Sequence, residues 1–63
     1  MASKKKVNKI LELLAEGKKQ FEIAEVLGIS KITLDKDIGY LKRDFDAKNI
    51  PNLIYKATID GHI

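Results

Sequence analysis

Cysteine is absent from the chain of 63 residues, so disulfide bonds and thiolate metal sites are excluded. A chain of this length buries only about 60% of its unfolded surface on folding, which leaves a marginal hydrophobic core. Short connections between helices are the simplest way to close such a core, and association of two copies would add buried surface. The composition therefore favours a small helical fold.

The sequence also lacks a long apolar run. A helix needs about 20 consecutive apolar residues to cross a bilayer, and no stretch of this chain is close to that length. The chain starts with Met-Ala-Ser-Lys-Lys-Lys, which is basic but is not followed by the apolar segment of a signal peptide. We therefore expect a cytoplasmic protein that makes no contact with a membrane.

Side chains suited to catalysis are scarce. Histidine occurs once, at His62, next to the last residue. No Ser–His pair, pair of carboxylates or glycine-rich phosphate loop accompanies it. We therefore expect that the protein is not an enzyme and that it has no cofactor, metal site or small-molecule substrate.

Basic residues, by contrast, are plentiful, with a net charge of +3 and a pI near 9.3. The total alone is compatible with ordinary solubility, but the distribution is informative. The basic residues gather in clusters at Lys4, Lys5, Lys6, Lys9, Lys18, Lys19, Lys36, Lys42 and Arg43. Basic clusters beside a helix that could enter a DNA groove are typical of nucleic-acid binding.

The spacing of apolar residues predicts three helices, at Lys4–Glu16, Gln20–Leu27 and Lys31–Asp44. Ser3 is expected to cap the first helix and Gly17 to end it. The apolar stripes that face the core are expected at Val7, Ile10, Leu11, Leu13, Leu14, Ile23, Ala24, Leu27, Leu34, Ile38, Leu41 and Phe45.

Two residues of the second helix, and the residue just before it, do not fit this simple pattern. Phe21 and Val26 flank its apolar stripe, and we expect them at the edges of the core rather than in a binding surface. Lys19 occupies the N-cap position, where Ser, Thr, Asp or Asn is favoured. A cation there is unfavourable to the helix dipole, a penalty that a nearby phosphate would reverse.

The second and third helices meet at the short turn Leu27-Gly28-Ile29-Ser30. Gly28 can adopt a left-handed conformation and stop one helix, and Ser30 can cap the next by accepting a backbone hydrogen bond. Two helices joined in this way form a helix-turn-helix, whose second helix enters the DNA major groove. We expect one such domain over residues 1–63, with residues 1–5 as a flexible basic arm.

The third helix has two opposite faces at 100° per residue. Ile32, Lys36, Gly39 and Arg43 lie opposite its apolar stripe. A solvated face would favour a polar residue in place of Ile32. Gly39 destabilises a helix interior by roughly 1 kcal/mol relative to alanine, and core packing does not require it on this side. Both residues favour a contact face over a solvated surface.

The C-terminal segment allows two interpretations. Apolar residues alternate over residues 52–59, as in the strand of a winged variant. A lone strand would have no partner in this chain. The alternative is a helix over Pro51–Asp60, with Asn49 as its cap, Pro51 in its first turn and Gly61 as its stop. We prefer the helix.

This fourth helix would have an apolar face made of Ile50, Leu53, Ile54 and Ala57. Tyr55 and Ile59 would point the other way, one turn apart. These side chains are either solvated or part of a dimer contact, and two large apolar groups on the outside of a terminal helix favour the dimer.

Several short segments match a known family pattern: Leu13-Leu14-Ala15-Glu16-Gly17, Glu22-Ile23-Ala24, Leu27-Gly28-Ile29-Ser30, Thr33-Leu34 with Ile38 and Leu41, and then Asn49, Leu53-Ile54, Ala57 and Gly61-His62-Ile63. With them the chain resembles the LuxR/GerE-type DNA-binding domain over nearly its whole length after the lysine-rich start. The first half also resembles DeoR-type helix-turn-helix regulators, and the ending points to the four-helix kind. The resemblance implies an all-α fold, a three-helix core with a short fourth helix, in a transcription regulator. Because no receiver or ligand-sensing domain is attached, we expect a stand-alone domain whose signal input comes from elsewhere.

The resemblance also implies roles for residues. The third helix would read the major groove, with Ser30 and Thr33 on phosphates and Asp35, Lys36 and Gly39 near bases. The fourth helix often mediates dimerisation in this family.

The chain departs from the family pattern at three positions. Lys19 stands where a Ser or Thr cap is common, and Asp37 where histidine is frequent. Asp35 replaces a residue that is usually basic or polar; it could accept a hydrogen bond from cytosine N4 or repel phosphates.

The complete expected site has two parts. Base contacts are expected from Ile32, Asp35, Lys36, Gly39 and Arg43, with a basic side chain on guanine and Ile32 on a thymine methyl. Phosphate contacts, which fix the register on DNA, are expected from Lys18, Lys19, Gln20, Ser30, Lys31, Thr33, Tyr40 and Lys42.

We therefore expect sequence-specific binding of double-stranded DNA and regulation of transcription by a small homodimer on a pseudo-palindromic site. The alternative is a protein-interaction module of the same fold that binds a polymerase subunit or a larger regulator. The salt dependence of binding distinguishes these two functions. Affinity for DNA falls steeply as the salt concentration rises, whereas the affinity of an apolar protein interface changes little.

Overall fold

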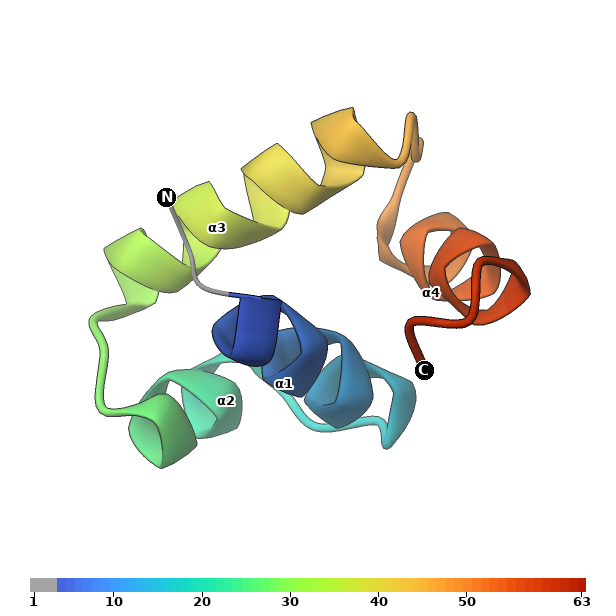
Figure 1. Cartoon of the computed structure of the whole chain (residues 1–63). Coiled ribbons are helices and arrows are strands. Elements are labelled where there is room, and N and C mark those ends of the chain that lie inside the picture. The colour runs from blue at the N-terminus through green and yellow to red at the C-terminus, as the bar shows by residue number, and fades with distance from the viewer. Residues whose placement is uncertain (1–3) are drawn as a thin grey trace.

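The computed structural model describes residues 4–63, with side chains from residue 7 onward. This part of the chain forms four helices and no strand (Figure 1). The helices are α1 (Lys4–Ala15), α2 (Gln20–Leu27), α3 (Lys31–Asp44) and α4 (Ile50–Ile59). The prediction of an all-α helix-turn-helix fold is confirmed, and the C-terminal segment is a helix and not a strand.

The predicted boundaries agree with the observed ones to within one residue. Helix α1 ends at Ala15, one residue before the predicted end, and α4 begins one residue early, at Ile50. Pro51 takes the second position of α4, where the missing N–H is harmless because the first N–H groups of a helix have no partner inside it. The expected cap at Ser3 lies outside the described residues, and the expected basic arm overlaps the start of α1.

Helix α1 is the centre of the fold, because it packs against each of the other three helices (Figure 1). Apolar side chains from all four helices form one core: Ile10, Leu11, Leu13, Leu14, Ile23, Ala24, Leu34, Ile38, Leu41, Leu53 and Ala57. Burial of a large aliphatic side chain contributes about 1.5–3 kcal/mol, so these residues dominate the stability of a chain this small. The predicted apolar stripes are confirmed. No helix in residues 4–63 is long and apolar enough to cross a membrane.

The expectation that Phe21 and Val26 border the core is wrong. Phe21 is 55% exposed and Val26 62% exposed. Helix α2 has only two turns, and its contact with the core is made by Ile23 and Ala24, with Leu27 half-buried. Phe21 and Val26 lie outside that narrow arc, so solvent reaches more than half of each.

All four helices end with a left-handed residue, at Gly17, Gly28, Asp46 and Gly61. After α3 this residue is Asp46, with φ of 53°, a conformation that costs energy in a residue with a side chain. The Ala47 N–H donates to the Lys42 carbonyl oxygen at 2.7 Å, and the Asp46 N–H donates to the Arg43 carbonyl oxygen at 3.1 Å. These bonds satisfy the last carbonyl groups of α3 and turn the chain toward α4.

Local hydrogen bonds define the start of α4. The Asn52 N–H donates to Asn49 Oδ1 at 2.8 Å, and the Lys48 N–H donates to Asn52 Oδ1 at 3.1 Å. Each asparagine therefore satisfies a backbone donor at the helix entrance, as the two partners of a capping box do. The predicted cap at Asn49 is confirmed.

Two contacts tie α4 and the residues after it to the end of α3. Lys56 Nζ donates to the Asp46 carbonyl oxygen at 2.6 Å. The rings of Phe45 and His62 meet edge to face, with centroids 5.3 Å apart. His62 thus contributes to packing at the C-terminal end.

Candidate nucleic-acid interface

The turn between α2 and α3 is set by Gly28, which has φ of 68°. Glycine enters this left-handed region without steric cost. The Gly28 N–H donates to the Glu25 carbonyl oxygen at 3.2 Å, and the Ile29 N–H donates to the Ala24 carbonyl oxygen at 3.0 Å. Ile29 is half-buried against the core. The turn therefore fixes the direction in which α3 leaves α2.

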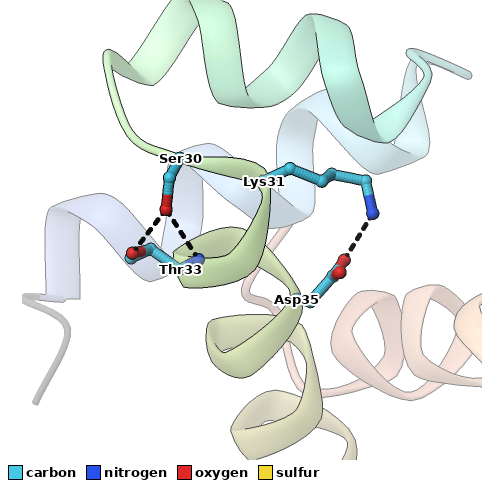
Figure 2. A network of polar contacts seen from close by, with 4 residues as sticks. All are labelled: Ser30, Lys31, Thr33 and Asp35. Carbon is cyan, nitrogen blue, oxygen red and sulfur yellow. Dashed lines mark hydrogen bonds and ion pairs between the residues drawn. The ribbon is translucent and has the colours of Figure 1, made fainter.

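Ser30 holds the start of α3 through two contacts with Thr33 (Figure 2). Ser30 Oγ accepts a hydrogen bond from the Thr33 N–H at 3.1 Å, which is the predicted cap. The Ser30 hydroxyl donates to Thr33 Oγ1 at 2.9 Å. Thr33 Oγ1 is the acceptor in that bond, so the Thr33 hydroxyl keeps its hydrogen for another acceptor. Both side chains are exposed, at the end of α3 that follows the turn.

The outer face of α3 consists of Ile32, Asp35, Lys36, Gly39, Tyr40 and Arg43, all of which are exposed. Ile32 is 69% exposed, although it is a β-branched apolar residue. Beyond the adjacent residues and backbone of α3 itself, a Cβ at position 39 would meet no atom within 4 Å, so packing against the rest of the fold does not require Gly39. The face therefore begins with an apolar residue, Ile32, and ends with a basic one, Arg43. Between them lies Gly39, which has no side chain.

An ion pair crosses the first turn of α3 beside this face (Figure 2). Lys31 Nζ lies 2.7 Å from Asp35 Oδ1, and the two side chains are 50% and 52% exposed. The charge of Asp35 is therefore partly neutralised in the free protein. The ammonium of Lys31 is held on the same side of the helix as the carboxylate.

Arg43 and Tyr40 are neighbours on the last part of the outer face. The guanidinium carbon of Arg43 lies 5.9 Å from the centre of the Tyr40 ring, within the range of a cation–π contact. This contact favours positions of Arg43 over the outer face. Lys42, on the flank of α3, is half-buried.

The start of α2 carries a second basic group, in which Lys18 and Lys19 are exposed and Gln20 is half-buried. A lysine side chain has no hydrogen-bond acceptor, so Lys19 cannot cap α2 with it. Glu22 compensates by accepting the Lys19 backbone N–H at 3.0 Å, which is one half of a capping box and brings a negative charge to the helix start. The Lys19 side chain remains in solvent.

The residues expected to contact a second copy lie on another helix. Tyr55 is 63% exposed and Ile59 64% exposed, on the side of α4 that faces away from its buried residues Leu53 and Ala57. They are separate from the outer face of α3.

The structure thus gathers the expected base contacts on one face, which also includes Tyr40, and leaves the other expected phosphate contacts at the helix starts and flanks. The ion pair between Lys31 and Asp35 was not predicted, although the spacing of four residues in a helix is its usual signal. The hydrogen bond between the hydroxyl groups of Ser30 and Thr33 was not predicted either.

Four short helices on one core, with a tight glycine turn before a helix whose outer face is free of core contacts, define a helix-turn-helix domain of the four-helix kind. Residues 5–57 match the bacterial regulatory proteins of the luxR family (GerE). The chain belongs to this family, whose members are DNA-binding regulators. Comparison with curated proteins and with solved structures found no match.

Proposed function

We propose that the protein recognises a specific sequence in double-stranded DNA with α3 in the major groove, and regulates transcription as a small homodimer. The observation that carries the proposal is the outer face of α3. It combines exposed Ile32, Lys36 and Arg43 with a bare Gly39 that the fold does not need.

Each residue of this face suits a feature of the groove. Lys36 or Arg43 can donate to O6 and N7 of guanine, and Ile32 can pack on a thymine methyl. Gly39 has no side chain to hold the DNA away, so bases or sugars can approach the α3 backbone there. Asp35, on the same face, is the acidic member of the set.

Phosphate contacts would fix the register of α3 without reading the sequence. Lys18, Lys19 and Gln20 would supply them from α2. The remaining phosphate contacts would come from the start of α3, its flanks and the edge of its outer face, at Ser30, Lys31, Thr33, Tyr40 and Lys42. The hydroxyl hydrogen of Thr33 and the exposed ammonium of Lys19 support this arrangement.

The dimer would form through α4, with Tyr55 and Ile59 at the contact. It would place two copies of α3 in successive major grooves, about one helical turn apart, on a pseudo-palindromic site. The proposal includes cytoplasmic residence, where a bacterial regulator meets the chromosome.

The test begins with a DNA sequence selected by the protein from a random pool at moderate salt. We expect Lys36→Ala and Arg43→Ala each to weaken binding to that sequence by roughly tenfold to a hundredfold, because a base contact by a basic side chain contributes about 1–3 kcal/mol. Mobility shift assays measure the affinity, and circular dichroism checks the fold.

Lys48→Ala is the matched control, since it removes an equal charge from an exposed residue between α3 and α4. We expect it to change the affinity for the selected sequence little. Equal affinity of the wild type and both α3 variants would contradict the assignment of α3 to the groove.

The second candidate function is a protein-interaction module that binds a polymerase subunit or a larger regulator. The exposure of Phe21 and Val26 on α2 favours it. Binding measured from low to high salt separates the two functions, because only the DNA complex releases counterions. If no DNA is shifted at any salt concentration, the DNA proposal fails and the second candidate leads.

A further inference from the structure

Asp35 is an acidic side chain on a face proposed to meet a polyanion. It is exposed on the outer face of α3, one turn after Ile32 and beside Lys36. Phosphate groups repel a carboxylate. If this face served only to increase the affinity for DNA, a neutral or basic residue would be expected in place of Asp35. The structure offers a reason to tolerate the acid, because Lys31 Nζ lies 2.7 Å from Asp35 Oδ1.

This ion pair is poorly suited to stabilise the helix. Both side chains are half-exposed, and water screens such pairs so that they contribute little. The order of the charges is also the weaker one, since an acid four residues before a base is better than the reverse. Lys31 is the first residue of α3, where the helix dipole disfavours a cation. A role outside folding explains the pair better.

The chemistry of the groove limits what Asp35 can recognise. An ionised carboxylate only accepts hydrogen bonds, and it has about four acceptor positions, so the bond from Lys31 does not exhaust it. The donors that bases present in the major groove are N4–H₂ of cytosine and N6–H₂ of adenine. Adenine places the acceptor N7 beside its donor, which repels a carboxylate, whereas cytosine presents the donor alone. Cytosine is therefore the base that Asp35 fits.

We propose that Asp35 determines specificity by selecting a cytosine in the major groove, and that Lys31 is its counterion in the free protein and binds a phosphate in the complex. This inference rests on the proposed function of α3 and adds the base and the exchange of partners. The long side chain of Lys31 can exchange one anion for another because it lies at the surface.

The experiment compares the wild type with Asp35→Ala on the selected sequence and on versions of it with each base pair changed in turn. We expect one C·G pair at which the wild type loses about tenfold or more in affinity when the pair is changed. Asp35→Ala should lose that preference and keep the preferences at the other positions.

Asp44→Ala is the matched control, because it removes the same charge from an exposed residue of α3 that lies off the outer face. It should bind all sequences slightly better and keep the preference for the C·G pair. A second variant, Asp35→Asn, should shift the preference at that position from cytosine toward adenine, because an amide matches both N6 and N7 of adenine.

Lys31→Ala tests the counterion. We expect weaker binding to all sequences alike, a salt dependence reduced by about one phosphate contact, and an unchanged preference for the C·G pair. Circular dichroism should show all four variants folded, since the altered side chains are exposed.

Two outcomes have different meanings. If the wild type selects a sequence and Asp35→Ala binds every version of it more tightly with unchanged preferences, Asp35 acts only as a charge and the inference is overturned. If the wild type binds no DNA at any salt concentration, the proposed function itself fails.

Discussion

Gly39 lies inside α3, and beyond the adjacent residues and backbone of that helix no atom lies within 4 Å of the place that a Cβ would occupy. Glycine destabilises a helix interior by about 1 kcal/mol relative to alanine, and neighbouring side chains do not demand it here. A residue that is unfavourable for folding and unnecessary for packing is best explained by what approaches it from outside. The proposed occupant of that space is DNA.

We expect Gly39→Ala to stabilise the protein and weaken its binding to DNA. The free energy of unfolding should rise by up to about 1 kcal/mol, and the midpoint of thermal unfolding by about 4–8 °C. Affinity for the selected sequence should fall by about tenfold or more, which corresponds to about 1.4 kcal/mol, because the methyl group would separate α3 from the DNA.

Calorimetry and mobility shift assays on the same preparation measure the two effects. A higher melting temperature rules out misfolding as the cause of lost binding. Unchanged DNA affinity in this variant would show that no surface approaches α3 closely at this position.

At the scale of the helices, the ends of the elements determine the path of the chain. Three helices turn at glycine, whereas α3 turns at Asp46, whose φ is 53°. The same residue accepts the bond from Lys56 Nζ through its carbonyl oxygen at 2.6 Å. At the junction between α3 and α4, Asp46 therefore has an unfavourable backbone conformation. Its contact with Lys56 uses only its backbone carbonyl oxygen, so the contact does not require the aspartate side chain.

We expect Asp46→Gly to raise the free energy of unfolding by roughly 0.5 kcal/mol. Glycine relieves the left-handed strain, and the greater freedom of the unfolded chain offsets part of the gain. The carbonyl oxygen that Lys56 contacts remains. Urea denaturation measures the change.

Gly61→Ala is the matched comparison, because it makes the opposite change at the end of α4, where φ is 79°. It should lower the free energy of unfolding by about 1 kcal/mol. A destabilised Asp46→Gly variant would mean that the aspartate side chain, and not only its backbone, supports the junction.

Much of the fold follows from local patterns in the sequence. The spacing of apolar residues predicted where the helices lie. Gly28, Ser30 and Asn49 predicted where helices begin or end, because capping involves residues close together in the chain. The left-handed Asp46 could not be foreseen, since a residue other than glycine carries no comparable signal for that conformation.

Which side of a helix is buried and which is exposed was predicted correctly for α3 but only in part for α2. On α3 the buried stripe is long enough to identify the opposite face. On the two turns of α2, the placement of Phe21 and Val26 depends on which neighbouring helices pack there, and that is decided by tertiary structure. For Lys31 and Asp35 the spacing permits an ion pair, but the pair forms only if the two side chains turn toward each other.

At the scale of the whole molecule, four helices share a core centred on α1, within overall dimensions of 28 × 22 × 20 Å. Two exposed surfaces are left over. Each carries an exposed isoleucine and an exposed tyrosine, Ile32 and Tyr40 on the outer face of α3 and Tyr55 and Ile59 on the outside of α4. Only the first also carries Lys36 and Arg43, and these basic residues agree with the proposed partners, DNA for the outer face of α3 and a second copy for α4.

We expect the double variant Tyr55→Asp and Ile59→Asp to be a folded monomer. Two carboxylates would have to be buried without partners in the proposed dimer contact, while the fold tolerates them because both side chains are mostly exposed. Sedimentation equilibrium measures the mass, and binding to a single half-site should persist.

Val26→Asp is the control, since it places the same charge on an exposed apolar residue of α2. It should sediment as the wild type does. A wild type that is monomeric at high concentration would refute a dimer through α4.

The central position of α1 has a consequence for such a dimer. Helices α3 and α4 both pack on α1 as well as on each other, so α1 helps to set the angle and distance between the surface proposed to read bases and the surface proposed to pair two copies. The bases of each half-site would then depend on side chains of α3. The number of base pairs between the half-sites would depend on the packing of α1, a helix from which no base contact is proposed.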